Sequence, residues 1–262
     1  ALRNIKNIIV VGSGKGGVGK STVSTNLAIC LSQKKFKVGL LDADIYGPSI
    51  PKMLKINEKP KISKEKKILP FEKYGIRSMS IGNLIDEEKP IIWRGAMVVR
   101  ALNQMLTDIA WGELDFLIID LPPGTGDIQL SLSQSLSISG AVVVTTPQDI
   151  SLIDVRKAIN MFKRVNVEIT GIIENMSFLK QGNKKIYIFG KDGGLNESKK
   201  QKIPFLGQIP ILPEITTHSD LGKPVTTDKK SESFLVYDKV INNFLKYLKK
   251  DSKSNNTKIT FE

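Results

Sequence analysis

The sequence predicts an α/β fold, in which a doubly wound, mostly parallel sheet carries helices on both faces. Short apolar runs alternate with longer amphipathic segments along the chain, as strands and helices do in this class. The runs are continuously apolar, which is typical of parallel strands that are buried on both faces. A glycine-rich turn at residues 12–19 separates the first apolar run from the first helical segment.

The expected strands are short apolar runs bounded by turn-forming residues. They lie at residues 7–11, 37–41, 77–81, 116–119, 141–145, 168–173 and 205–209. The expected helices separate these runs and carry apolar residues at helical spacing. They lie at residues 22–34, 96–109, 151–164 and 233–250.

The last of these helices has one apolar face, with lysines nearby. Its apolar residues are Phe234, Tyr237, Ile241, Phe244 and Leu248. The face can either dock on the sheet of its own domain or lie on a membrane surface. We favour docking, because a polar segment follows the helix. Residues 1–248 are therefore expected to form a single domain, and residues 249–262 a disordered polar tail.

Composition and charge exclude several classes of protein. The chain has 262 residues and no apolar run near the ~20 residues of a membrane span. Its single cysteine excludes an internal disulfide and a four-cysteine metal site. The net charge of +13 comes mainly from scattered lysines, so neither nucleic acid nor membrane is an expected partner. A cytoplasmic protein is expected, and the start at Ala1 instead of Met is consistent with a removed segment.

The glycine-rich turn has the spacing of a phosphate-binding loop. It reads G-x-x-x-x-G-K-[ST] and lies between an expected strand and an expected helix. Backbone N–H groups of such a loop converge on phosphate oxygens, and the helix N-terminus favours anions. Lys20 is expected to neutralise the phosphates of ATP during catalysis, and the Ser21 hydroxyl to bind Mg²⁺. The expected nucleotide contacts are Gly14, Lys15, Gly16, Gly17, Val18, Gly19, Lys20, Ser21 and Thr22.

A second lysine, Lys15, lies early in the same loop. Its side chain is expected to point away from its own nucleotide and to stabilise the transferring phosphoryl group of a facing subunit. The pattern K-G-G-x-G-K-[ST] resembles the deviant Walker A motif of the MinD, ParA and nitrogenase iron-protein group of ATPases. That resemblance implies an ATP-dependent homodimer in which Lys15 crosses the interface as a catalytic residue. A solvated lysine without a catalytic role is the alternative.

Three aspartates follow expected strands, at the sheet edge where ligands bind in this class. Asp44 is expected to orient and activate the attacking water, with a helix or turn cap as the alternative. Asp42 is expected to support either the Mg²⁺ shell or the end of the strand. Asp120 ends an apolar strand, as in a Walker B motif, and is expected to bind Mg²⁺ directly or through water. In the following loop, the Gly124 amide is expected to sense the γ-phosphate.

Two residues are candidates for a pocket around the adenine base. Asn175 follows the strand at residues 168–173, and its side-chain amide offers a donor and an acceptor to the base edge. A simple turn at the strand end explains an asparagine there equally well. Pro210 follows the last expected strand and is expected to wall the base by apolar contact.

Six segments point together to one family. They read DADIYGPSIP, WRGAMVVRALNQML, DLPPGTGDIQLSLSQ, VTTPQDISLIDVRKAINMF, IIENMS and FLGQIPILPEI. They resemble the Mrp family of bacterial iron–sulfur cluster carrier ATPases, from about Ile5 to Val225. The resemblance implies a slow ATPase that carries 4Fe–4S clusters as a homodimer and delivers them to apoproteins. At matching positions it implies site roles for the phosphate loop, Asp44, Asp120 and Asn175.

The chain departs from that family at the expected cluster site. Cluster-carrying members have Cys-x-x-Cys shortly after Asn-Met-Ser, and each subunit supplies two thiolates to a shared cluster. Residues 178–194 read FLKQGNKKIYIFGKDGG here and contain no cysteine. Cys30 falls within an expected helix and is interpreted as a core residue. Direct cluster binding is therefore left open, with a cluster held by a partner protein or lost as the alternatives.

Two functions stay open at this point. The first is an ATP-hydrolysing iron–sulfur carrier or assembly protein, whose partners are apoprotein clients or iron–sulfur scaffold proteins. The second is a nucleotide-switched scaffold on membrane or nucleoid, as in MinD and ParA relatives. A small-molecule kinase or ligase is a third class, and the sequence carries no recognisable substrate motif for it.

Overall fold

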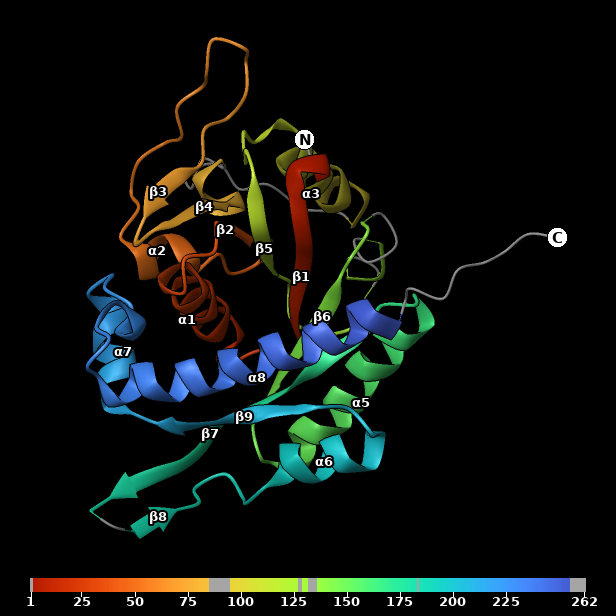
Figure 1. Cartoon of the computed structure of the whole chain (residues 1–262), viewed down its shortest axis with the longest axis vertical. Helices are drawn as coiled ribbons and strands as arrows, with labels where there is room; N and C mark the ends of the chain where they lie inside the picture. The colour runs from red at the N-terminus through yellow and green to blue at the C-terminus, as the bar shows by residue number, and fades with distance from the viewer. Residues whose placement is uncertain (1, 85–94, 127–128, 132–135, 183, 255–262) are drawn as a thin grey trace, which may run out of the picture.

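The computed structural model describes residues 2–84, 95–126, 129–131, 136–182 and 184–254 (Figure 1). Its strands are β1 (Ile5–Ser13), β2 (Val38–Asp42), β3 (Phe71–Lys73), β4 (Ile76–Ser80), β5 (Leu114–Asp120), β6 (Gly140–Thr145), β7 (Ile169–Gln181), β8 (Lys184–Ile186) and β9 (Phe205–Ile211). Its α-helices are α1 (Lys20–Gln33), α2 (Ile50–Leu54), α3 (Gly95–Asp108), α5 (Asp149–Arg164), α6 (Gly193–Gln201), α7 (Pro213–Asp220) and α8 (Glu232–Ser254). Short 3-10 helices lie at Leu2–Asn4, Ile81–Asn83 and Val225–Thr227.

The strands form one sheet that is parallel except at β3 and β8. The order is β3-β4-β2-β5-β1-β6-β7-β8, and β9 pairs in parallel with β7. The chain places β2, β4 and β5 on one side of β1 and β6, β7 and β9 on the other. Ligands in such sheets bind beyond the carboxyl ends of the strands, where the strand order reverses. The predicted doubly wound fold is confirmed, and it makes the end of β1 the expected position of a ligand.

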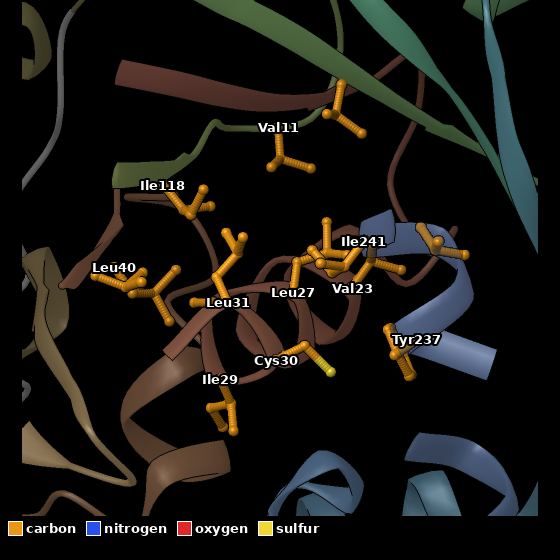
Figure 2. Close-up of a cluster of buried hydrophobic side chains, with 14 of the residues drawn as sticks. Val11, Val23, Leu27, Ile29, Cys30, Leu31, Leu40, Ile118, Tyr237 and Ile241 are labelled. Carbon is orange, nitrogen blue, oxygen red and sulfur yellow. The ribbon is translucent and has the colours of Figure 1, made fainter. Parts of the chain in front are cut away.

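Two apolar layers cover the faces of this sheet. Neighbouring residues of β1 face opposite layers, with Val10 in one and Val11 in the other. The layer around Val10 contains residues of α3 and α5. The layer around Val11 contains residues of α1 and α8, including Leu27 and Ile241, which Figure 2 shows close together. Because both faces are covered, the strands are apolar throughout, which accounts for the continuous runs in the sequence.

Each expected strand and helix is present, with ends that differ by a few residues. The largest difference is β7, which continues through a polar stretch to Gln181 and there pairs with β8. Sequence reasoning missed β3, β8, α2, α6 and α7. These elements are short, and short helices and strands depend on packing rather than on local pattern. Helix α8 continues to Ser254, past the expected domain boundary at 248, and the remaining expected tail at 255–262 lies outside the described residues.

Helix α8 docks on the sheet, as the sequence predicted. Tyr237, Ile241 and Phe244 are buried between α1 and the strands, and the Phe244 ring lies 6.1 Å from that of Phe116. Figure 1 shows the helix lying along β9 and across the body of the domain. The apolar face of α8 is therefore used inside the domain. Among the described helices, none combines the length and apolar character needed to cross a membrane.

We expect Phe244→Ala to lower the free energy of unfolding by about 3–5 kcal/mol, because it removes a ring that is only 3% exposed and leaves a cavity. Leu235→Ala in the same helix is the control, because Leu235 is 62% exposed and its truncation should change stability by less than about 0.5 kcal/mol. Urea unfolding followed by circular dichroism measures both. Equal effects of the two substitutions would contradict the docking of α8.

Candidate nucleotide-binding site

The glycine-rich loop connects β1 to α1 at the switch point of the sheet. Gly17 and Gly19 have φ of 79° and 81°, a left-handed conformation that favours glycine. A Cβ at Gly14 would overlap the backbone of Asp154 in α5, so only glycine fits there. The loop encloses a pocket of about 210 Å³. The pocket is lined by Ser13, Lys15, Gly16, Gly17, Val18, Gly19, Lys20, Ser21, Thr22, Asp44, Ser49 and Pro123.

The fully buried carboxylate of Asp120 joins β5 to the start of α1. Its Oδ2 accepts hydrogen bonds from Lys20 Nζ at 2.8 Å and from Ser21 Oγ at 2.5 Å. Its Oδ1 accepts a hydrogen bond from Ser24 Oγ at 2.7 Å. The structure thus brings together the lysine, the hydroxyl and the carboxylate that the two motifs predicted. A carboxylate beside a serine hydroxyl supplies the oxygen atoms that Mg²⁺ prefers.

Asp44 lies in the turn after β2 and lines the same pocket. Its Oδ2 lies 3.8 Å from Lys20 Nζ, and its buried Oδ1 has no hydrogen-bond partner in the described part of the chain. Burial raises the pKa of the Asp44 carboxyl, and the nearby Lys20 ammonium opposes that rise. A buried acceptor without a partner is costly, so this oxygen is suited to a ligand-borne donor or to a water in the pocket.

Asp42 faces the protein rather than the pocket. Its carboxylate accepts hydrogen bonds from the Asp44 amide at 3.1 Å, the Ile50 amide at 3.2 Å and Ser80 Oγ at 3.0 Å. Asp42 is also the register partner of Asp120 across β2 and β5. Burial, and then the charge of Asp120, raise the pKa of Asp42 to about 7. Of the two roles expected for Asp42, this geometry favours support of the strand end and of the turn that carries Asp44, and the Mg²⁺ role stays a prediction.

Lys15 lies at the rim of the pocket and is partly buried. Its Nζ is 3.4 Å from Oε1 of Gln148, the residue that precedes α5. This contact lies at the long end of hydrogen-bond distances, so the alternative of a solvated lysine stays open. The catalytic role of Lys15 in a second subunit stays a prediction.

Asn175 lies in β7 with its amide against the phosphate loop. Its Nδ2 donates a hydrogen bond to the Val18 carbonyl at 2.8 Å, and a Cβ on Gly19 would overlap this amide. The amide nitrogen is therefore engaged by the loop and not directed to a base edge. Pro210 is buried in β9 and is absent from the residues that line the pocket. The adenine-binding roles of both residues stay predictions.

The loop after β5 is hydrogen-bonded to the end of β1. The Gly124 amide donates to the Ser13 carbonyl at 3.0 Å, with Gly124 at φ 95°. An amide that senses the γ-phosphate would first have to leave this carbonyl. The predicted movement of this loop therefore has a defined starting contact.

Sequence reasoning missed Ser24, Gln148 and Glu174. Glu174 is buried in β7, where its carboxylate accepts hydrogen bonds from the Gly194 amide at 2.6 Å and from Gln208 Nε2 at 2.8 Å. Burial raises the pKa of Glu174, and these two hydrogen bonds oppose the rise. A single carboxylate inside an apolar run is the sequence signal that could have identified Glu174. For the other two no local pattern exists, because their partners lie far away in the chain.

The structure offers no ligands for an iron–sulfur cluster among the described residues. Cys30, the one cysteine of the sequence, is buried in α1 (Figure 2), as predicted for a core residue. Burial raises the pKa of its thiol to about 12. No group of three or more His, Cys, Asp or Glu side chains in the described ranges is placed to hold a metal ion. A thiolate-ligated cluster therefore does not fit this chain by itself.

Comparison with protein families agrees with the geometry. The model of the family described as NUBPL iron-transfer P-loop NTPase, of the ParA group, matches residues 4–245. The chain belongs to this family. The lysine, serine and aspartate cluster described above thus lies at the glycine-rich loop of a NUBPL-type P-loop NTPase.

Relatives of this NUBPL-type chain share about half of its residues. It is 51% identical to the iron-sulfur cluster carrier protein of Aquifex aeolicus over 84% of the chain, but spans only 62% of that relative's length. It is 47% identical to the iron-sulfur cluster transfer protein NUBPL of Dictyostelium discoideum, covering 99% of the chain and 84% of the relative. A solved nucleotide-binding protein from Archaeoglobus fulgidus, in complex with ADP, has a TM-score of 0.78 and 38% identity, with 90% of this chain and 93% of that chain covered.

We expect Cys30 to resist alkylation by iodoacetamide in the native protein at pH 8. With a pKa near 12 instead of 9.0, its thiolate fraction is about a thousandfold lower, and only the thiolate reacts. The same protein unfolded in guanidinium chloride is the control and should be modified rapidly. Mass spectrometry gives both rates, and equal rates would contradict the buried position of Cys30.

Proposed function

We propose that this chain hydrolyses ATP as a homodimer and uses the reaction to drive iron–sulfur cluster assembly or delivery to apoproteins. The observation that carries this proposal is that Lys20 and Ser21, which line the pocket, are hydrogen-bonded to the buried Asp120, in a chain whose family is described as iron-transfer P-loop NTPases. The named relatives act in cluster carriage or transfer. The proposal extends that role to this chain.

Each group of residues at the pocket is proposed to have a separate role in phosphoryl transfer. The loop amides and Lys20 would bind the phosphate oxygens, which places the γ-phosphoryl group near Asp44. Ser21 and Asp120 would hold a Mg²⁺ ion, and Asp44 Oδ1, which has no hydrogen-bond partner among the described residues, offers an acceptor at the same pocket. When bound, Mg²⁺ neutralises the charge on the phosphate oxygens. Asp44 would hold the attacking water by accepting its hydrogen bond.

Lys15 is proposed to complete the site across a dimer. Its ammonium group lies at the pocket rim, held by Gln148 at 3.4 Å, a contact that a phosphate oxygen can replace. A cation supplied by a facing subunit would stabilise the charge that develops on the transferring group. Hydrolysis would then belong to the pair of subunits.

The cluster itself is proposed to be held by a partner protein. This chain has no cysteine besides the buried Cys30, so it cannot supply the pair of thiolates that the resemblance to cluster-carrying ATPases implies. Its role would be to drive the transfer between an iron–sulfur scaffold protein and an apoprotein. The alternative of a MinD- or ParA-like scaffold on membrane or nucleoid is not favoured, because relatives sharing about half of the residues are named as cluster carriers.

The test of this function is a two-component transfer assay without oxygen. The chain alone, supplied with iron and sulfide, is expected to retain no stable cluster. A cluster-loaded scaffold protein and an apo-ferredoxin are then mixed with the chain, and cluster arrival is followed by circular dichroism. ATP with Mg²⁺ should accelerate transfer, and Lys20→Ala should abolish the acceleration. Transfer that is indifferent to the chain and to ATP would overturn the proposal.

We expect Lys15→Ala to bind ATP normally but to lose hydrolysis by about a hundredfold or more, because it removes the cation that stabilises the transition state. Dimerisation in the presence of a non-hydrolysable ATP analogue should also be lost. Lys64→Ala, which removes an exposed lysine that does not line the pocket, is the control for the change in charge. Phosphate release and light scattering measure the two effects. A normal rate of ATP hydrolysis by the Lys15 variant would contradict the proposal that Lys15 acts on the nucleotide of the facing subunit.

A further inference from the structure

The β7–β8 hairpin and the segment after it form a basic surface, which we call the basic hairpin (residues 178–182 and 184–191). Figure 1 shows the hairpin extending away from the body of the sheet. It carries four lysines and no acidic residue within the sequence FLKQGNKKIYIFGK. These lysines are Lys180, Lys184, Lys185 and Lys191.

The hairpin brings lysine side chains close together, and the repulsion between their like charges costs free energy. Lys180 and Lys185 lie directly opposite each other in the β7–β8 pair, where like charges are destabilising. Lys180 is compensated by Glu232, whose Oε1 lies 2.8 Å from its Nζ. Lys185 lies over the Phe178 ring, whose centroid is 4.3 Å from its Nζ, and no ion pair of Lys185 is found among the described residues. A cation held over a ring keeps its charge available to an anionic partner.

The hairpin also exposes aliphatic side chains. Lys184 and Ile186 alternate with Lys185 along β8 and so lie on the opposite face of the strand. Ile186 is 40% exposed and Ile188 is 52% exposed. β8 is the last strand of the sheet, so in the described part of the chain its outer edge has no strand beside it. Such an edge can accept an extended peptide through main-chain hydrogen bonds.

The aromatic residues of the hairpin favour a polypeptide partner over a single-stranded nucleic acid. Single-stranded nucleic acids need open aromatic faces on which bases stack. Phe178 is only 9% exposed and is covered by Lys185, and the Tyr187 ring has Lys191 Nζ 5.3 Å from its centroid. The exposed apolar groups are aliphatic instead, which fits burial against a protein chain.

We infer that the basic hairpin binds an extended acidic segment of a partner protein. Its carboxylates would pair with Lys184, Lys185 and Lys191, and its apolar side chains would cover Ile186 and Ile188. The acid-binding surface stands on the hairpin alone. Only the identification of the partner as a cluster donor or client rests on the proposed function.

The experiment measures binding of a short fluorescein-labelled peptide of alternating Glu and Val to the full chain by fluorescence anisotropy. The double variant Lys184→Glu and Lys185→Glu should bind about tenfold or more weakly, because it replaces two attractions by repulsions. The control variant Lys61→Glu and Lys64→Glu makes the same change in net charge on an exposed loop outside the hairpin and should bind as the wild type does. Raised salt should weaken binding to the wild-type chain.

Several outcomes would overturn the inference. One is an equal loss of peptide affinity in the hairpin and control variants, which would mean that net charge alone attracts the peptide. Another is absence of peptide binding, including the case in which oligothymidylate or phosphatidylglycerol vesicles bind at the same lysines. Ile188→Ser keeps every charge and should lower the affinity for the peptide about threefold. It therefore serves as a second variant if the charge-reversal variant fails to fold.

Two further readouts separate this inference from the proposed function. ATP hydrolysis should be unchanged in the hairpin variants, because no hairpin lysine lines the phosphate pocket. Peptide binding at the hairpin by a chain that shows no ATP-dependent cluster transfer would refute the proposed function and leave the acidic docking surface in place. ATP-dependent cluster transfer by a chain that does not bind the peptide would refute the acidic docking surface and leave the proposed function in place.

Discussion

The buried carboxylate of Asp120 is the constraint on which the site depends. An ionised group that is completely excluded from water must be paired and hydrogen-bonded, and Asp120 satisfies this through Lys20, Ser21 and Ser24. All three donors come from the first turns of α1, so the carboxylate fixes that helix against β5. The glycine-rich loop is thereby held at the switch point of the sheet. The same contact that orders the fold presents the phosphate-binding groups to the pocket.

A second pair of residues connects this pocket to the rest of the sheet. Asn175 and Glu174 are neighbours in β7, and the alternation of a strand directs them to opposite faces. Asn175 holds the Val18 carbonyl of the phosphate loop, and Glu174 holds the Gly194 amide at the start of α6. The same strand continues into the basic hairpin. β7 is thus the physical connection between the nucleotide loop and the surface proposed to receive a partner.

The hairpin is also where this chain differs from the cysteine-containing family that it resembles. Thiolates are soft ligands that hold iron, whereas lysine ammonium groups cannot ligate it and instead attract carboxylates. The residues expected to bind ATP are present, whereas residues 178–194 contain no cysteine that could ligate a cluster. This combination is the basis of the proposal that the chain acts on a cluster held by another protein.

By itself, the sequence determined the parallel sheet, the phosphate loop and the carboxylate of Asp120. These depend on periodicity and on spacing between near neighbours, which the chain displays directly. Only the tertiary structure decided that Asp42 turns toward Ser80 and that Asn175 holds the Val18 carbonyl. The partners in both contacts lie far apart in the chain and come together through strand order and register. Side-chain type says what a group can bind, and the packing of distant strands decides which partner it meets.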